Sequence, residues 1–145
     1  MTIEKNIKVL SGITQTLIDS CKGIQMCEVV ASQSQFLQAE LKNRQTDRTF
    51  LVNEFQEKIA NYGGKYEECS NASAPIHKSY IEFINTYEKN QKAAIDLLNT
   101  GEAHLAEHIE SKLDEEGLTE GSIRLLRRAH AKTVTCEQFS YYLNG

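Results

Sequence analysis

The 145-residue sequence predicts an all-α protein, an up-down-up-down four-helix bundle followed by a C-terminal helical arm. Two observations support this class. Apolar residues recur at steps of three and four along most of the chain, a spacing typical of amphipathic helices. The chain also contains a single proline, a residue that helix interiors exclude. No stretch alternates between apolar and polar residues as a half-buried strand would.

Two long helices are predicted in the first half of the chain. The first covers about residues 3–31. Its seam, the stripe of positions that faces the other helices, consists of Ile3, Ile7, Leu10, Thr14, Leu17, Cys21, Ile24, Glu28 and Ala31. "SQSQ" at 32–35 is a short turn. The second helix covers about residues 36–62, with the stripe Phe36, Leu37, Leu41, Arg44, Arg48, Leu51, Phe55, Ile59 and Tyr62. Gly63-Gly64 is expected to end it, because glycine is favoured just past a helix.

Two further helices complete the predicted bundle. After the loop "KYEECSNASA", Pro75 opens a third helix, whose core stripe is Ile76, Tyr80, Phe83, Ile84 and Tyr87. A tight connection, "KNQK" at 89–92, leads to a fourth helix at about residues 92–116. Its spaced positions are Ile95, Leu98, Glu102, Leu105, Ile109 and Leu113. Short connections between such helices make sequential neighbours antiparallel.

The C-terminal segment is predicted to be a helical arm. Gly117 ends the fourth helix, Thr119 is a plausible cap for the next segment, and "TVTCEQFSYYL" at 133–143 contains β-branched residues that are expected to weaken or break a helix. We therefore divide the chain into a bundle, residues 1–116, and an arm, residues 117–145. The apolar end of the arm favours packing on the bundle or on a neighbouring subunit.

Five motifs of the chain resemble those of a known family: "LIDSCK" (17–22), "DRTFLVNEF" (47–55), "YGG" (62–64), "PIHKSY" (75–80) and "GEAHLAEHIESKL" (101–113). On these, residues 17–113 resemble a bacterial ferritin-like four-helix-bundle family catalogued as a domain of unknown function. The resemblance implies a ferritin-like bundle, often self-associating, with no established reaction. After "CK" the chain reads "GIQMCE" where the family usually has acidic residues, and Tyr80 stands where the family often has tryptophan.

The chain lacks the pattern of a di-iron bundle site. Such a site takes Glu-x-x-His from each of two helices, and no Glu-x-x-His occurs in the sequence, since Glu102 is followed at the third position by Leu105. His104 and His108 are spaced to share a zinc or nickel ion, but two ligands make only a weak site. We expect them on a solvated helix face, and we predict no metal and no cofactor.

The candidate binding residues are Glu28, Arg48, His77 and Glu102. Glu28, Arg48 and Glu102 occupy seam positions, where a buried charge is costly unless it is paired. They are expected to form ion pairs within the bundle, in two separate contacts; a ligand or metal pocket is the alternative. His77 belongs to the family motif and is more often a local packing residue than a catalyst. No catalytic residue is predicted.

Composition limits the partners and the compartment. A net charge of −4 provides no basic field for nucleic acid, and no apolar run approaches the roughly 20 residues that span a bilayer. The N-terminus lacks signal-peptide features, so a cytoplasmic location is expected. The four cysteines, without any Cys-x-x-Cys pair, are then expected to be free thiols.

"RLLRRAHAK" at 124–132 concentrates basic residues on the arm. It is expected either to pair with "DEE" at 114–116 or to dock an acidic partner or another subunit. The favoured hypothesis is a non-enzymatic, homo-oligomeric (dimeric) interaction or stress-associated protein. The alternatives are a degenerate metal-binding bundle of the di-iron type, and a regulatory module that docks a protein partner through residues 118–145.

Overall fold

Four long helices make up a bundle in the computed structural model, which describes residues 2–30, 35–65 and 91–144, with side chains as far as residue 134. They are α1 (Ile3–Val30), α2 (Gln35–Asn61), α4 (Gln91–Leu113) and α5 (Glu120–Asn144). No strand occurs in these ranges. The predicted all-α four-helix bundle is therefore confirmed. Within the described ranges, no helix has the length and apolar character needed to cross a membrane.

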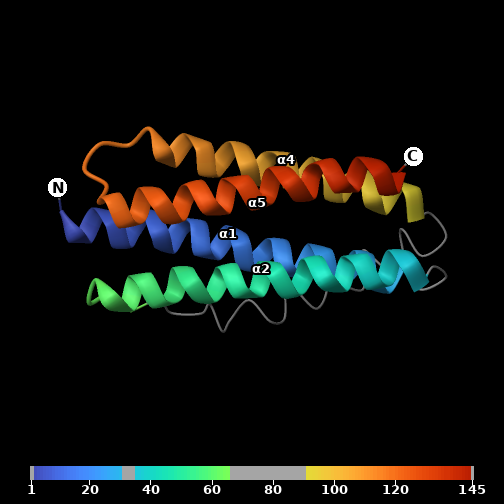
Figure 1. Cartoon of the computed structure of the whole chain (residues 1–145), viewed down its shortest axis with the longest axis horizontal. Helices are drawn as coiled ribbons and strands as arrows, with labels where there is room; N and C mark the ends of the chain where they lie inside the picture. The colour runs from blue at the N-terminus through green and yellow to red at the C-terminus, as the bar shows by residue number, and fades with distance from the viewer. Residues whose placement is uncertain (1, 31–34, 66–90, 145) are drawn as a thin grey trace.

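The helices pack as two antiparallel hairpins (Figure 1). α1 pairs with α2 and α4 pairs with α5, while α1 also packs on α4 and α2 touches α5. α1 and α5 run in one direction, and α2 and α4 run in the other. The predicted third helix, residues 76–87, lies outside the described residues. The fourth described helix is instead α5, the segment predicted as an arm; the domain boundary at residues 116/117 stays a prediction.

Gly63 follows the end of α2, as its position in the sequence predicted, whereas α4 ends at Leu113 and Gly117 lies in the turn before α5. Gly63 has a φ of 83° and Gly117 a φ of 86°, the left-handed conformation that favours glycine. Gly64 N–H donates to the Ile59 carbonyl at 2.9 Å. A Cβ on Gly64 would lie 2.9 Å from two side-chain carbons of Ile7, so this glycine lets the end of α2 approach α1 closely.

A buried asparagine joins the start of α1 to the turn between α4 and α5. The Asn6 side-chain amide donates to the Gly117 carbonyl at 3.1 Å and accepts from the Thr119 N–H at 2.8 Å. Thr119 in turn caps α5, because its Oγ1 accepts the Ser122 N–H at 3.1 Å. Tyr62, at the end of α2, hydrogen-bonds the same Thr119 hydroxyl. This end of the bundle is therefore held by side chains from α1, α2 and α5.

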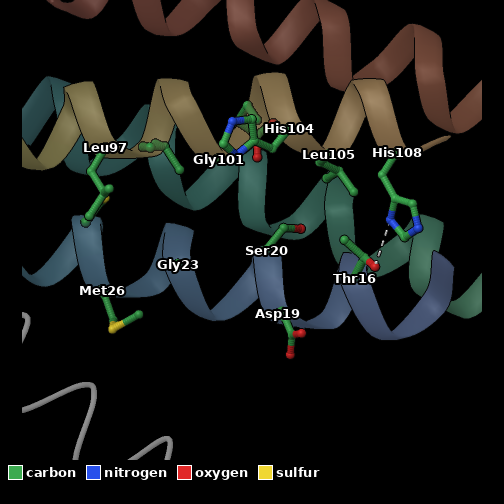
Figure 2. Close-up of a pocket in the computed structure, with 13 residues that line it drawn as sticks. Thr16, Asp19, Ser20, Gly23, Met26, Leu97, Gly101, His104, Leu105 and His108 are labelled. Carbon is green, nitrogen blue, oxygen red and sulfur yellow. Dashed lines mark hydrogen bonds between the residues drawn. The ribbon is translucent and has the colours of Figure 1, made fainter. Parts of the chain in front are cut away.

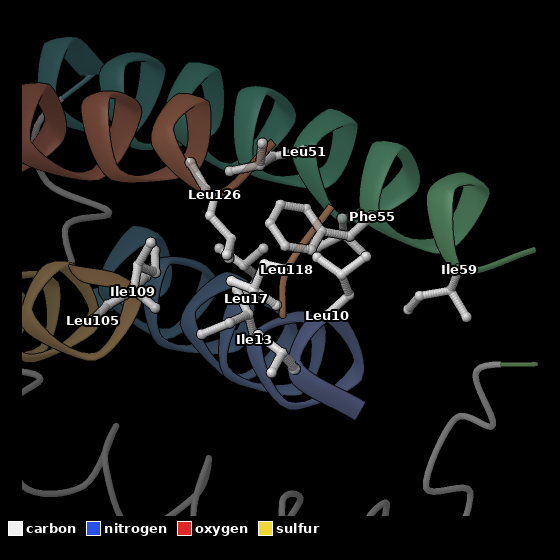
Figure 3. Close-up of a cluster of buried hydrophobic side chains, with 13 residues drawn as sticks. Leu10, Ile13, Leu17, Leu51, Phe55, Ile59, Leu105, Ile109, Leu118 and Leu126 are labelled. Carbon is white, nitrogen blue, oxygen red and sulfur yellow. The ribbon is translucent and has the colours of Figure 1, made fainter. Parts of the chain in front are cut away.

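The buried core is divided into two apolar clusters with a polar layer between them (Figure 3 shows the first cluster). The first cluster joins all four helices and includes Leu10, Leu17, Phe55, Ile109 and Leu126. The second joins α1, α2 and the start of α4, and is formed by Ile24, Cys27, Val30, Leu37, Leu41, Ala94, Ile95 and Leu98. Between them α2 and α4 carry buried polar side chains, namely Arg44, Arg48, Asn99 and Glu102.

Local expectations differ from the structure at three further places. The helix does not break at "TVTCEQFSYYL", since α5 continues to Asn144; Thr133 is buried, and its hydroxyl donates to the Ala129 carbonyl at 2.8 Å, which satisfies the polar group inside the helix. Phe36 belongs to no core stripe and is 66% exposed. Pairing of the basic segment with residues 114–116, one of its two expected roles, is not found in the described residues: Arg124 contacts Glu120, Arg128 contacts Glu54, and His130 lies 3.9 Å from Glu110.

Candidate functional site

The polar layer is centred on a buried ion pair between α2 and α4. Arg48 Nη1 donates to Glu102 Oε1 at 3.0 Å, and Nη2 donates to Oε2 at 2.6 Å, a bidentate arrangement. The two side chains are 2% and 1% exposed. Helical spacing brings them here, because Arg48 lies between Leu41 and Phe55 on the core stripe of α2, and Glu102 between Leu98 and Leu105 on that of α4.

Ser20 of α1 extends the ion pair to a third helix. Arg48 Nη1 also donates to Ser20 Oγ at 2.7 Å, and the Ser20 hydroxyl donates to the Leu17 carbonyl at 2.6 Å. Both carboxylate oxygens of Glu102 therefore accept from one guanidinium, which is itself tied to α1. A buried charge that is paired and hydrogen-bonded in this way avoids most of the cost of leaving water. Sequence analysis did not single out Ser20, because a lone serine in a helix carries no pattern.

The structure does not bring all the candidate residues together. Glu28 lies eight residues beyond Ser20 on α1, about 12 Å along the helix axis, and its carboxylate is 3.9 Å from the largely exposed Lys42 ammonium. His77 lies outside the described residues. Arg48 and Glu102 thus form one contact and Glu28 another, and in the described residues no group of three or more His, Cys, Asp or Glu side chains could hold a metal ion.

An apolar groove runs between α1 and α4 beside the ion pair (Figure 2). Its volume is about 520 Å³, and its walls include Met26 from α1 and Leu97 and Leu105 from α4. Ser20 and Glu102 also line it. This volume lies within the roughly 300–1,000 Å³ of small-molecule sites. Because Arg48 already binds the Glu102 carboxylate, the groove offers mainly van der Waals contact.

Two interior helix glycines keep the groove open. Gly23 of α1 and Gly101 of α4 both line it, and a Cβ added to either would meet nothing within 4 Å. Neither glycine has a positive φ, so neither is needed for backbone conformation. Sequence analysis missed both. The available signal was their position inside predicted helices, where glycine costs about 1 kcal/mol relative to alanine.

The histidines of α4 line the outer part of the groove. His104 is exposed, as expected, whereas His108 is half-buried, and its Nδ1 is 3.3 Å from Thr16 Oγ1 of α1. In Figure 2, His104 and His108 project from successive turns of α4. His108 therefore links α1 to α4 by a hydrogen bond, a role that its spacing in the sequence did not predict.

Two thiols near the polar layer are poor nucleophiles. Burial raises the pKa of Cys27 to about 12, and its Sγ is 3.6 Å from the Ala94 carbonyl oxygen. Burial also raises the pKa of the half-buried Cys21, against the opposing effect of the Arg48 charge. Because the thiolate is the reactive form, neither position suits nucleophilic catalysis. Both are free thiols, as predicted; Cys69 and Cys136 lie outside the described side chains.

Comparison with known proteins places the chain in one family. A family model described as a domain of unknown function (DUF2383) matches residues 5–115. The chain belongs to the DUF2383 family. The match contains α2, α4, all of α1 except its first two residues, and the whole polar layer, but it ends before α5. No curated protein matches the chain, and no solved structure does. Membership in DUF2383 assigns no activity, so a function has to be argued from the geometry.

Proposed function

We propose that this DUF2383 protein is a non-enzymatic, homo-oligomeric interaction protein, a cytoplasmic bacterial relative of ferritin-like bundles. The observation that carries the proposal is the bidentate binding of Glu102 by Arg48. A carboxylate whose two oxygens accept from a buried guanidinium is occupied, and a metal ion would have to displace that cation. The centre of the bundle is then structural, and the function falls to the outer surface.

Exposed aromatic side chains support self-association. Phe36 and Phe50 of α2 are 66% and 61% exposed, and large apolar side chains on a surface are frequent at protein–protein contacts. The basic residues of α5 would add electrostatic attraction to such a contact. A protein partner docked through residues 118–145 would use the same basic residues. In the favoured form of the proposal, the partner is another copy of the chain.

The competing metal-binding function makes a different prediction. It would use Glu28, His77 and Glu102, but Glu28 lies about 12 Å along α1 from the level of the ion pair. The test is to purify the protein without nickel affinity, incubate it anaerobically with ferrous iron, desalt it and measure metal by mass spectrometry. We expect well below one iron per chain, and an oligomer by light scattering at micromolar concentration. Near-stoichiometric iron would overturn the non-enzymatic proposal, and a monomer would overturn self-association.

A further inference from the structure

We propose that the outer flank shared by α2 and α5 binds a second copy of this chain, with α2 of each copy lying over α5 of the other. This inference rests on the self-association proposed above. We call this flank the α2/α5 face, and define it by five exposed residues: Asp47, Phe50, Glu57, Arg124 and Arg127. Charge complementarity between the two helices is the observation that selects this face and this partner.

Contacts inside the protein fix the direction of the α2 side chains. Glu54 is 3.2 Å from Arg128 of α5, so this position of α2 points toward α5. At about 100° per residue, Asp47, Phe50 and Glu57 all lie within roughly 60° of Glu54 around the helix. They therefore share the flank beside α5. The buried Arg48 and Phe55, which turn toward the core, lie about 120° and 100° from Glu54 around the helix.

The two halves of the face carry opposite charge. On this flank α2 presents Glu40, Asp47, Glu54 and Glu57, together with one cation, Lys58, which lies beside Gly121 of α5. On α5 the exposed cations are Arg124, Arg127 and Arg128. Glu54–Arg128 is an ion pair within the chain, and Arg124 pairs with Glu120 on its own helix at 3.0 Å. Apart from Lys58 on α2 and Glu120 on α5, a mainly acidic strip thus runs beside a mainly basic strip along one side of the bundle.

Two-fold symmetry makes such a face self-complementary in only one of two orientations. If the two-fold axis lies across the helices, α2 meets α2 and like charges face each other. If the axis runs along the helices, α2 of one copy meets α5 of the other and residue levels are kept. Phe50, one turn from Glu54, then lies over the turn containing Arg127 and Ala131 of the second copy, where an arginine can stack on the ring.

The size of the face suits a stable dimer. α5 has 25 residues, which as a helix extends about 37 Å, and two helices side by side are about 20 Å wide. The outline of the two helices, which extends beyond the five residues that define the face, is therefore about 700 Å² on each copy. A standard protein–protein interface buries about 800 Å² on each partner, so the contact is large enough without other surfaces.

The test is a charge exchange between copies. One variant carries Asp47→Lys and Glu57→Lys, which gives both strips a net positive charge. A second carries Arg124→Glu and Arg127→Glu, which gives both strips a net negative charge. Glu54 and Arg128 are left unchanged to keep the internal pair. A control with the same charge change as the first variant, Glu4→Lys with Glu107→Lys, alters exposed positions on α1 and α4. Circular dichroism verifies folding, and light scattering with native mass spectrometry measures association.

We expect the unaltered protein and the control to dimerise. Each strip variant should have a dimer dissociation constant at least about 30-fold higher than that of the unaltered protein. An equimolar mixture of the two variants should form a heterodimer whose dissociation constant is within about threefold of the original value, because strips of opposite charge face each other again. If both folded strip variants remain dimers, this face is not the interface, although self-association stands. If the unaltered protein is a monomer up to about 100 µM, both the inference and the self-association fail.

Discussion

Removing either partner of the Arg48–Glu102 pair should destabilise the bundle strongly. Both side chains are almost completely buried, at 2% and 1% exposure, and two hydrogen bonds of 3.0 and 2.6 Å join them. Removing one partner leaves an uncompensated buried charge, which costs about 3–5 kcal/mol. A domain of this length has a total stability of about 5–15 kcal/mol. Glu102→Leu or Arg48→Met alone should therefore remove a large part of the free energy of unfolding.

Replacing both partners should have a much smaller effect. The double variant Arg48→Met with Glu102→Leu leaves no buried charge, and apolar replacements of this kind range from neutral to about 4 kcal/mol more stable. Urea unfolding followed by circular dichroism measures the free energy of unfolding of all three variants. The control is Glu28→Gln, whose 3.9 Å pair with the exposed Lys42 should matter by less than about 0.5 kcal/mol. Single variants that lose less than 1 kcal/mol would refute the account of the polar layer.

Two further outcomes follow from the backbone and from burial. Gly23→Ala should raise the free energy of unfolding by about 0.5–1 kcal/mol, because the added Cβ meets no atom and alanine favours helix. Gly64→Ala should lower it by more than about 1 kcal/mol, because the added Cβ would lie 2.9 Å from Ile7. Thermal unfolding of the two variants compares these effects. Cys27 should resist iodoacetamide at pH 8 and react after unfolding, because its pKa is raised to about 12; mass spectrometry of digested protein detects the label, and rapid native labelling would contradict its burial. Since the unfolded thiol titrates near 9.0, Cys27 contributes stability that is intact below pH 9 and is lost toward pH 12.

Helical periodicity made most of the described fold predictable from sequence. Steps of three and four placed Leu10, Leu17 and Phe55 in the core, and glycine chemistry located the end of α2. The failures have physical causes. The weak helix propensity of Thr133 was overridden by burial and by a hydrogen bond to the preceding turn. Phe36 is exposed because it lies about 100° around α2 from its neighbour Leu37, which is buried. Propensity acts locally, whereas these outcomes depend on which helix lies beside which.

The candidate site was predictable in its residues but not in its pairing. The positions of Arg48 and Glu102 on the apolar stripes of their helices marked them as charges in the core. Such positions can be predicted because they depend only on spacing within one helix. Which charges meet depends on the axial register between helices, and no pattern within one helix encodes it. The same limit explains why Ser20 and the groove glycines Gly23 and Gly101 were missed, since they acquire a role only when α1 is placed against α4.

The polar layer itself offers a physical reason for that register. Two apolar clusters on either side of the layer could slide by a helical turn and still bury leucine and isoleucine side chains. A one-turn shift of α4 against α2, about 5.4 Å, would instead separate Arg48 from Glu102 and leave both charges buried and unpaired. The cost of that state, several kcal/mol, is comparable to the stability of a whole domain. The ion pair therefore discriminates against shifted packings. The double apolar variant, even if more stable, should give broader amide resonances in its NMR spectrum than the unaltered protein. Equally sharp resonances would show that the apolar clusters set the register unaided.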